Sequence, residues 1–149
     1  MLITLALTLL GVQGQSRTLT VCASCPLTTL KQAITAAQTG DTILVKAGHY
    51  REGEITVDKS LTLEGEDYPI LDGDHKTQIL TIIADDVTIR GFVLQNSGYS
   101  DLKEQAAIRV EQNQNCLIEN NKLYNNYFGI YLAKTQHCTI INNDVISKS

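Results

Sequence analysis

A short motif occurs twice in this chain with the same skeleton, Cys-x-Ile-x-Asn-Asn. CLIENN begins at Cys116 and CTIINN begins at Cys138. The neighbouring apolar positions repeat with the same offset, so that Ile108 recurs as Ile130. A fixed offset of this size is typical of a solenoid, in which units stack because one unit alone cannot bury its apolar side chains.

Earlier units show the same order of apolar positions, but equivalent residues lie further apart along the chain. The interval from Leu61 to Val87 exceeds that from Cys116 to Cys138, and the interval from Val87 to Cys116 is longer still. Regular strands joined by variable turns indicate insertions that loop outward without breaking the stack. In the unit that contains Val87, we expect Ile83 to be among the residues that point inward.

After Gly40, apolar residues alternate with period two in short runs separated by turn residues. Three such strands per unit make one rung of a solenoid, so we predict an all-β fold, a right-handed parallel β-helix. Equivalent residues of adjacent rungs should stack about 4.8 Å apart. This places Cys116 beside Cys138 and Ile118 beside Ile140. We interpret the two cysteines as buried core residues with free thiols.

The paired asparagines that end each motif suit the corners of such a coil. Asparagine tolerates the left-handed backbone that a tight corner requires. We expect Asn120 and Asn142 to stack there and to form a hydrogen-bonded ladder. In earlier rungs, Gly65 and Gly91 stand at the corresponding position.

One segment, TTLKQAITAAQTG at 28–40, has a helical period instead. Leu30, Ala33, Ile34 and Ala37 follow the spacing of an apolar helix face, with a threonine N-cap before them and a glycine stop after them. We expect this helix to cover the open first rung, because exposed strand edges promote aggregation.

The start of the chain indicates export. Residues 2–12 are almost entirely apolar, a run too short to span a bilayer but of the length of a signal-peptide core. We assign 1–14 to a signal peptide, 15–40 to an N-terminal cap and 41–149 to a β-helix truncated at its C-terminal end. Export would place the cysteines in an oxidising compartment. A formal net charge of −4 argues against binding to nucleic acid.

A Cys-x-x-Cys motif, CASC, lies just after the predicted signal peptide. Cys22 and Cys25 could close a small disulfide ring, hold a soft metal such as Cu(I), or do redox work. Zinc is not favoured, because neither a second Cys-x-x-Cys nor a pair of histidines follows. These three interpretations stay open at the level of the sequence.

A search for catalytic residues gives no clear site. Parallel β-helices often cleave polysaccharides, but the outward residues of the last two full rungs include no stacked carboxylates beside a base, and no paired carboxylates of a glycoside hydrolase. These residues are Arg109, Glu111, Leu117, Glu119, Tyr131, Ala133, Thr139 and Ile141. We therefore expect no enzyme, with a carbohydrate-active lyase or hydrolase, or a surface-binding solenoid, as alternatives.

One turn is much longer than the rest. SGYSDLKEQ at 97–105 accounts for most of the extra length between Val87 and Cys116. Such insertions in a solenoid usually lie on its functional face. We expect Tyr99, Asp101 and Lys103 to be exposed there and to lie near any partner-binding surface.

Much of the chain resembles the NosD family of exported β-helix proteins. The start, VCASCPLTTLKQAITAA at 21–37, is similar to family members that carry a Cys-x-x-Cys motif there. The other similar strings are GDTILVKAGHYREGEITVDKSLTLEGE (40–66), PILDG (69–73), ADDVTIRGFVLQNSG (84–98), the long turn (97–105), AAIRV (106–110), IENNKL (118–123) and FGIYLAK (128–134).

The resemblance spans residues 21–149 and implies a periplasmic accessory protein for the maturation of nitrous oxide reductase, with no catalytic activity of its own. It implies partnership with an ABC-type ATPase and its membrane subunit, and with the reductase or a copper chaperone. It also implies a role in assembling a copper-sulfide centre. Copper would then be the metal for Cys22 and Cys25. Beyond Met1 the chain has no methionine, so it offers no thioether copper site.

Overall fold

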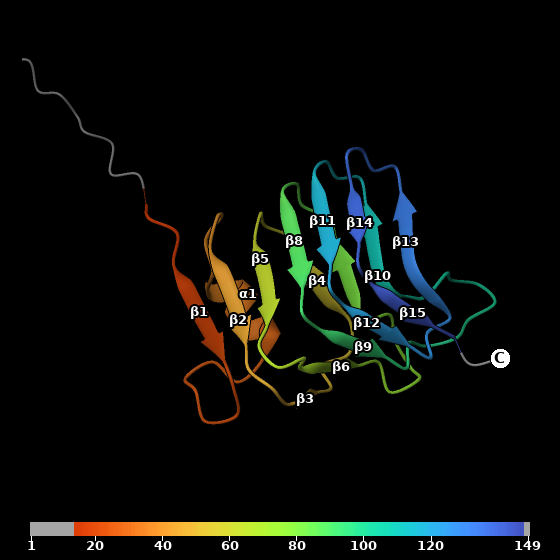
Figure 1. The fold of residues 1–149 in the computed structure, drawn as a ribbon, viewed down its shortest axis with the longest axis horizontal. Helices are drawn as coiled ribbons and strands as arrows, with labels where there is room; N and C mark the ends of the chain where they lie inside the picture. Colours follow the sequence, from red (N-terminus) through yellow and green to blue (C-terminus); the bar gives the residue numbers. More distant parts are fainter. Residues whose placement is uncertain (1–13, 148–149) are drawn as a thin grey trace, which may run out of the picture.

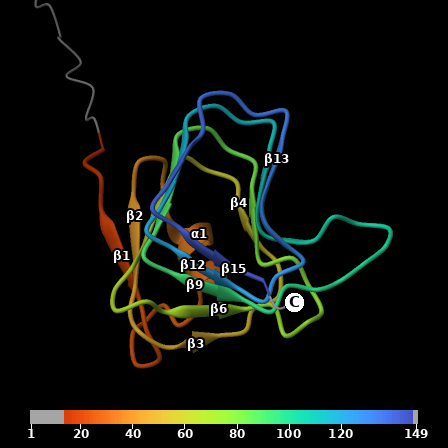
Figure 2. The same ribbon diagram turned by 45° about the vertical axis from the view of Figure 1, so that its right-hand side comes forward.

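The computed structural model describes residues 14–147, which form a parallel β-helix (Figure 1). The predicted signal peptide therefore lies almost wholly outside the described residues. The coil axis runs from β1 (Thr18–Val21) at one end to the last strands at the other. Its cross-section has three sides (Figure 2), and each side is one parallel sheet.

The three sheets take their strands in turn from successive rungs. The six-stranded sheet contains β1, β2 (Thr42–Val45), β5 (Thr62–Gly65), β8 (Val87–Arg90), β11 (Cys116–Glu119) and β14 (Thr139–Ile141). The five-stranded sheet contains β3 (His49–Tyr50), β6 (Ile70–Asp72), β9 (Val93–Gln95), β12 (Lys122–Tyr124) and β15 (Asp144–Ile146). The four-stranded sheet contains β4 (Ile55–Val57), β7 (Leu80–Ile82), β10 (Ala106–Glu111) and β13 (Phe128–Ala133).

The register of the six-stranded sheet follows the repeat read from the sequence. Thr42 pairs with Thr62, Thr62 with Thr88, Thr88 with Leu117 and Leu117 with Thr139. The steps along the chain between these partners are unequal, and the step that contains the long turn is the largest. Variable intervals between in-register strands confirm the predicted parallel β-helix.

Residues that alternate along each strand fill the interior. Leu80 and Ile82 of β7 are fully buried and pair on both sides with buried residues of β4 and β10. The expectation that Ile83 points inward is wrong, because Ile83 is 48% exposed. Ile82 and Ile83 are adjacent, and only one of them can face the core, because successive side chains of a strand point to opposite faces.

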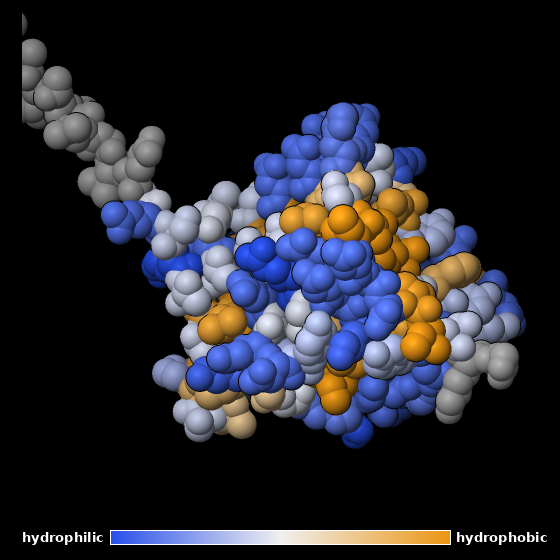
Figure 3. All heavy atoms as spheres, viewed as in Figure 1, coloured by the Kyte–Doolittle hydropathy of each residue, from blue (hydrophilic) through white to orange (hydrophobic). Residues whose placement is uncertain are grey.

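Exposure rises toward the last strands. Ile140 and Val145 belong to the inward columns of Ile118 and Leu123, yet they are 43% and 57% exposed. Figure 3 shows apolar side chains gathered over this end of the molecule, where Ile141 is also exposed. Ile118 itself is fully buried and pairs with Ile140, as the repeat predicts.

The corner asparagines differ from the expectation by one position. Asn120 and Asn142 do take the left-handed backbone, each with φ of 54°, but they are exposed and carry no ladder. The ladder uses the second asparagine of each pair: Asn121 Nδ2 donates to Asn143 Oδ1 at 3.1 Å, and Asn143 Nδ2 donates to the Ile118 carbonyl at 2.8 Å. The left-handed residue turns the chain, and this turn directs the next side chain into the corner.

Glycine is required where the earlier rungs pass this corner. A Cβ atom on Gly65 would lie 2.2 Å from the Gly91 carbonyl oxygen, so a side chain cannot fit there. Gly91 has a φ of 80°, in the region that favours glycine. The two glycines therefore let adjacent backbones approach closely, and Asn120 follows them in the next rung.

The helix α1 (Leu30–Ala36) covers the first rung, as predicted (Figure 2). Its buried side chains Leu30, Ala33 and Ile34 join the core at the N-terminal end. Thr29 is the N-cap and accepts a hydrogen bond from the Gln32 amide. In the described part of the chain, no helix is long and apolar enough to cross a membrane.

The helix is shorter than the predicted span of 28–40. Ala37 already has an extended backbone, and the next turn is organised by the buried Asp41. Asp41 accepts hydrogen bonds from the amides of Gln38 and Arg17, at 2.8 and 2.9 Å. Lys59 ends the helix by donating to the carbonyls of Ile34 and Ala37, where a cation also suits the helix dipole.

Cys116 and Cys138 lie one above the other, as predicted, with Cα atoms 4.4 Å apart. They are joined in a disulfide, so the interpretation as free core thiols is wrong. Cys116 is buried and Cys138 is only half-buried. Stacking brought the two side chains within bonding distance, which makes the disulfide a direct result of the repeat.

Candidate functional site

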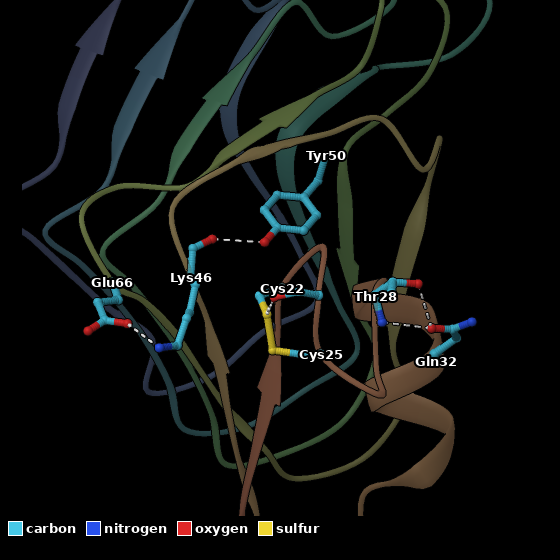
Figure 4. The surroundings of a disulfide bond; sticks show 8 residues. Cys22, Cys25, Thr28, Gln32, Lys46, Tyr50 and Glu66 are labelled. Carbon is cyan, nitrogen blue, oxygen red and sulfur yellow. Dashed lines mark hydrogen bonds and ion pairs between the residues drawn. A yellow bond between two sulfur atoms is a disulfide. The ribbon is translucent and has the colours of Figure 1, made fainter.

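The Cys-x-x-Cys motif forms a small loop between β1 and α1. Cys22 and Cys25 are joined by a disulfide, with Cα atoms 5.0 Å apart (Figure 4). The Cys25 amide donates to the Cys22 carbonyl at 3.2 Å, and the Cys22 amide donates to the Leu27 carbonyl at 3.2 Å. Both cysteines are half-buried. Of the three interpretations of this motif, the structure shows the disulfide.

As it stands, this loop does not fit a metal ion. Metal ligation requires thiolates, and both sulfur atoms are engaged in the disulfide. Within residues 14–147, no three histidine, cysteine, aspartate or glutamate side chains lie close enough together to hold a metal. Only reduction of the Cys22–Cys25 bond would supply soft ligands in this loop.

The long turn, residues 97–105, extends away from the coil between β9 and β10 (Figure 2). Tyr99 is 67% exposed, and Asp101 and Lys103 are exposed as predicted. The Tyr99 hydroxyl donates to Asp101 at 2.6 Å, and this hydrogen bond raises the pKa of Tyr99. At the tip, Leu102 is 94% exposed.

Aromatic rings form a row from this turn to the start of β13. Tyr99 and Tyr127 meet edge to face with ring centroids 4.7 Å apart, and Tyr127 meets Phe128 at the same distance. Phe128 lies 5.9 Å from Tyr131. The row ends at Arg109, whose guanidinium lies 4.7 Å from the centre of the Tyr131 ring.

A groove of about 410 Å³ lies between the long turn and the outer face of the four-stranded sheet. The lining residues are mostly polar or charged; they are Glu54, Lys76, Thr77, Gln78, Thr81, Leu102, Lys103, Glu104, Gln105, Arg109 and Glu111. Because Glu54, Thr81 and Arg109 come from three adjacent rungs, the groove runs along the axis of the coil.

Arg109 connects the turn to the sheet. Its side chain pairs with Glu111 on the same strand and lies 3.7 Å from the Glu104 carboxylate. It also donates to the Glu104 carbonyl at 3.2 Å. On the opposite side of the groove, Glu54 accepts a hydrogen bond of 2.6 Å from the Thr81 hydroxyl. Both walls thus hold their polar groups in defined positions.

The sequence reading missed a stack of charges on the six-stranded sheet. Arg90 lies between Glu64 and Glu119, with nitrogen–oxygen distances of 3.4 and 3.3 Å. These three residues stand at equivalent positions of successive units, so the signal was present in the sequence. Of the three residues, only Glu119 belongs to the last two full rungs, on whose outward residues the prediction of no catalytic site rests.

A second missed cluster lies on the five-stranded sheet around Asp72, whose side chain is 4% exposed. Burial alone would raise the pKa of Asp72, but hydrogen bonds from Gln95, the Asp74 amide, His49 and Asn96 outweigh it and lower the pKa to about 2. His49 Nε2 lies 2.8 Å from the carboxylate. The sequence suggests only a turn residue at Asp72, because its burial depends on neighbouring rungs.

A comparison with solved structures finds a similar chain in the crystal structure of the pectin methylesterase from Aspergillus niger in deglycosylated form. The TM-score is 0.36 and the sequence identity 20%, over 87% of this chain and 60% of that chain. The chain therefore spans less than two thirds of that structure, and the likeness concerns the fold alone. None of the curated proteins matches this chain.

A comparison with protein families finds a match that covers most of the chain. The family model for NosD, described as a periplasmic copper-binding protein, matches residues 34–149. The matched segment includes part of α1, every later strand and the long turn. The Cys22–Cys25 loop lies just before it. This chain belongs to the NosD family of periplasmic copper-binding proteins.

Proposed function

We propose that this protein is an exported accessory factor that assists assembly of the copper centre of nitrous oxide reductase. The observation that carries the proposal is the NosD family match over residues 34–149. We further propose that it acts in the periplasm with an ABC-type ATPase and its membrane subunit. Its direct partner there would be the reductase itself or a copper chaperone.

Two features of the molecule support a binding role on this scaffold. The solenoid presents broad, regular outer faces, and the long turn interrupts one of them with exposed Tyr99, Leu102 and Lys103. Tyrosine and arginine are enriched among the residues that contribute most to protein interfaces. We propose that Tyr99, Asp101 and Lys103 contact the partner, with the rest of the aromatic row beside them.

Copper would be a cargo of this protein. We propose that Cys22 and Cys25 hold Cu(I) when their disulfide is reduced, because thiolates are the soft ligands that Cu(I) prefers. Reduction consumes two electrons and two protons from a dithiol donor and leaves two thiols. The closed ring shown in Figure 4 would then be the form without copper.

The test is complementation of a nitrous oxide-respiring host that lacks its own gene of this family. The full-length protein should restore a purified reductase with normal copper content and the absorption of its copper-sulfide centre. Deleting 99–104 should leave the β-helix folded, because the turn lies outside the coil, but should lower the copper content of the reductase severalfold.

The matched control is Tyr68→Ala, which removes a tyrosine that is 41% exposed outside the long turn and the aromatic row. It should restore the reductase as well as the unmodified protein does. A reductase that is fully loaded without this protein would refute the proposed function. A reductase that is fully loaded by the deletion variant would refute only the role of the long turn.

A further inference from the structure

The groove beside the long turn has a balanced and dense set of polar groups. Its charged lining residues are three carboxylates and three cations: Glu54, Glu104, Glu111, Lys76, Lys103 and Arg109. Two threonines and two glutamines supply further donors and acceptors. Such a lining repels neither sign of charge overall, so it suits a neutral ligand with many hydrogen-bonding groups.

Two polar atoms in this lining lack a partner. Thr77 Oγ1 and Gln105 Oε1 are buried and make no hydrogen bond within the described residues. Both residues lie at the base of the long turn, where the Gly98 amide donates to the Thr77 carbonyl at 2.8 Å. Buried polar atoms in folded proteins are usually hydrogen-bonded. Two atoms without a partner beside one groove therefore indicate unused hydrogen-bonding capacity at this place.

The aromatic row continues the groove toward the next rung. Arg109 belongs to both, because it lines the groove and lies against the Tyr131 ring. Tyr127 and Phe128 are 43% and 38% exposed, so part of each ring is free to contact a ligand. The negative face of an aromatic ring attracts polarised C–H groups, and a tyrosine hydroxyl adds a hydrogen bond at its edge.

We propose that this groove and the adjoining aromatic row bind a neutral oligosaccharide, which lies along the coil axis across adjacent rungs. A sugar combines hydroxyl groups, which match the polar lining, with C–H faces, which match the rings. Leu102 is the one lining residue with a purely apolar side chain, and the others are polar or charged. The centre of a protein interface is depleted of charged residues, so this lining suits a sugar better than a protein partner. Carboxylates among the cations disfavour a polyanion, and Arg109 disfavours a metal cation.

The test is isothermal titration calorimetry with cellohexaose and hexa-N-acetylchitohexaose as neutral probes, and hexagalacturonate as an acidic one. The unmodified protein should bind a neutral probe saturably and the acidic probe more weakly. Tyr127→Ala and Glu111→Gln should each weaken binding about tenfold, the effect of losing one good contact. Circular dichroism and the thermal midpoint should stay unchanged, since both side chains lie outside the core.

Tyr68→Ala is the matched control, because Tyr68 is equally exposed but its ring contacts Lys122, away from the groove. It should bind like the unmodified protein. Absence of saturable binding to every probe would overturn the proposal, and so would equal weakening by Tyr68→Ala. Impaired reductase maturation by the groove variants, without sugar binding by the parent, would assign the groove to a protein partner instead. The proposal goes beyond the maturation role, and it shares Lys103 and the aromatic row with the surface proposed to contact the partner.

Discussion

Among single residues, the corner asparagines are of two kinds. Asn120 turns the backbone and is exposed, whereas Asn121 is 1% exposed and holds three segments together. Asn121 Oδ1 accepts from the Phe92 amide at 3.1 Å, and Nδ2 donates to the Ile89 carbonyl at 3.1 Å. The side chain therefore provides a partner for the buried Phe92 amide at the corner and adds a hydrogen bond to a carbonyl of β8.

Replacing Asn121 by leucine should lower the free energy of unfolding by about 2–3 kcal/mol, because two buried backbone groups lose their partners. The measurement is the unfolding midpoint in urea. Asn120→Gly is the control and should change stability by no more than about 0.5 kcal/mol, because glycine accepts the same backbone and the site is exposed. A larger effect at Asn120 than at Asn121 would contradict the assignment of the ladder.

Asp72 makes stability depend on acid pH. Its pKa is lowered to about 2 in the folded protein, below the ordinary value of 3.8. A carboxyl group with a depressed folded pKa contributes stability above its unfolded pKa and loses that contribution as pH falls through its folded pKa. Thermal stability should therefore fall as pH drops from about 4 to about 2.

Asp72→Asn should be less stable than the parent at neutral pH and should show a smaller fall in melting temperature over that acid range. Differential scanning fluorimetry across pH measures both. Asp58→Asn, at an exposed position, is the control and should keep the steeper fall of the parent. Parallel pH profiles of Asp72→Asn and the parent would contradict a native role for this carboxylate.

Among the structural elements, the last described rung is joined to its neighbour by a disulfide as well as by strand pairing. The strands β13, β14 and β15 expose much of their apolar surface, and the Cys116–Cys138 disulfide ties this rung to the one before it. A bond that closes a loop of this length stabilises by about 3 kcal/mol when it mainly restricts the unfolded chain. The disulfide thus adds a covalent link between two adjacent rungs.

Cys116→Ala/Cys138→Ala should lower stability by about 2–3 kcal/mol. Hydrogen–deuterium exchange measured by mass spectrometry should rise mainly in β13–β15. Cys22→Ser/Cys25→Ser is the matched control, because it removes a disulfide that closes only a short loop, and it should leave exchange in β13–β15 unchanged. Uniform loss of protection along the whole coil would show that the rungs unfold as one unit.

At the scale of the whole molecule, every cysteine of the described residues is engaged in a disulfide, and no free thiol is present among them. We expect anaerobic Cu(I) titration against a competing chelator to show tight binding only after a phosphine reductant has opened the disulfides. The binding should disappear in Cys22→Ser/Cys25→Ser and persist in Cys116→Ala/Cys138→Ala. Equal binding by the parent and the Cys22/Cys25 variant would leave a structural disulfide as the better account of that motif.

The repeat alone determined the coil, because period-two alternation defines strands, and the recurring order of apolar positions brings equivalent residues into register even where the intervals between them differ. That is why the stacking of Cys116 on Cys138 could be predicted. The capping helix was predictable from a different signal, the helical period of its apolar residues. The long turn was predictable from the repeat, since an interval longer than one rung must leave the coil.

Only the tertiary structure decided which of two neighbouring residues faces inward. It also decided which side chains from different rungs come together on the outer faces of the sheets. Ile82 rather than Ile83, and Asn121 rather than Asn120, fill the interior because a corner can shift the frame by one residue. The groove with Arg109, and the polar cluster around Asp72, depend on side chains from three rungs and on how the long turn folds back. These contacts join residues distant in sequence, and local patterns do not specify their geometry.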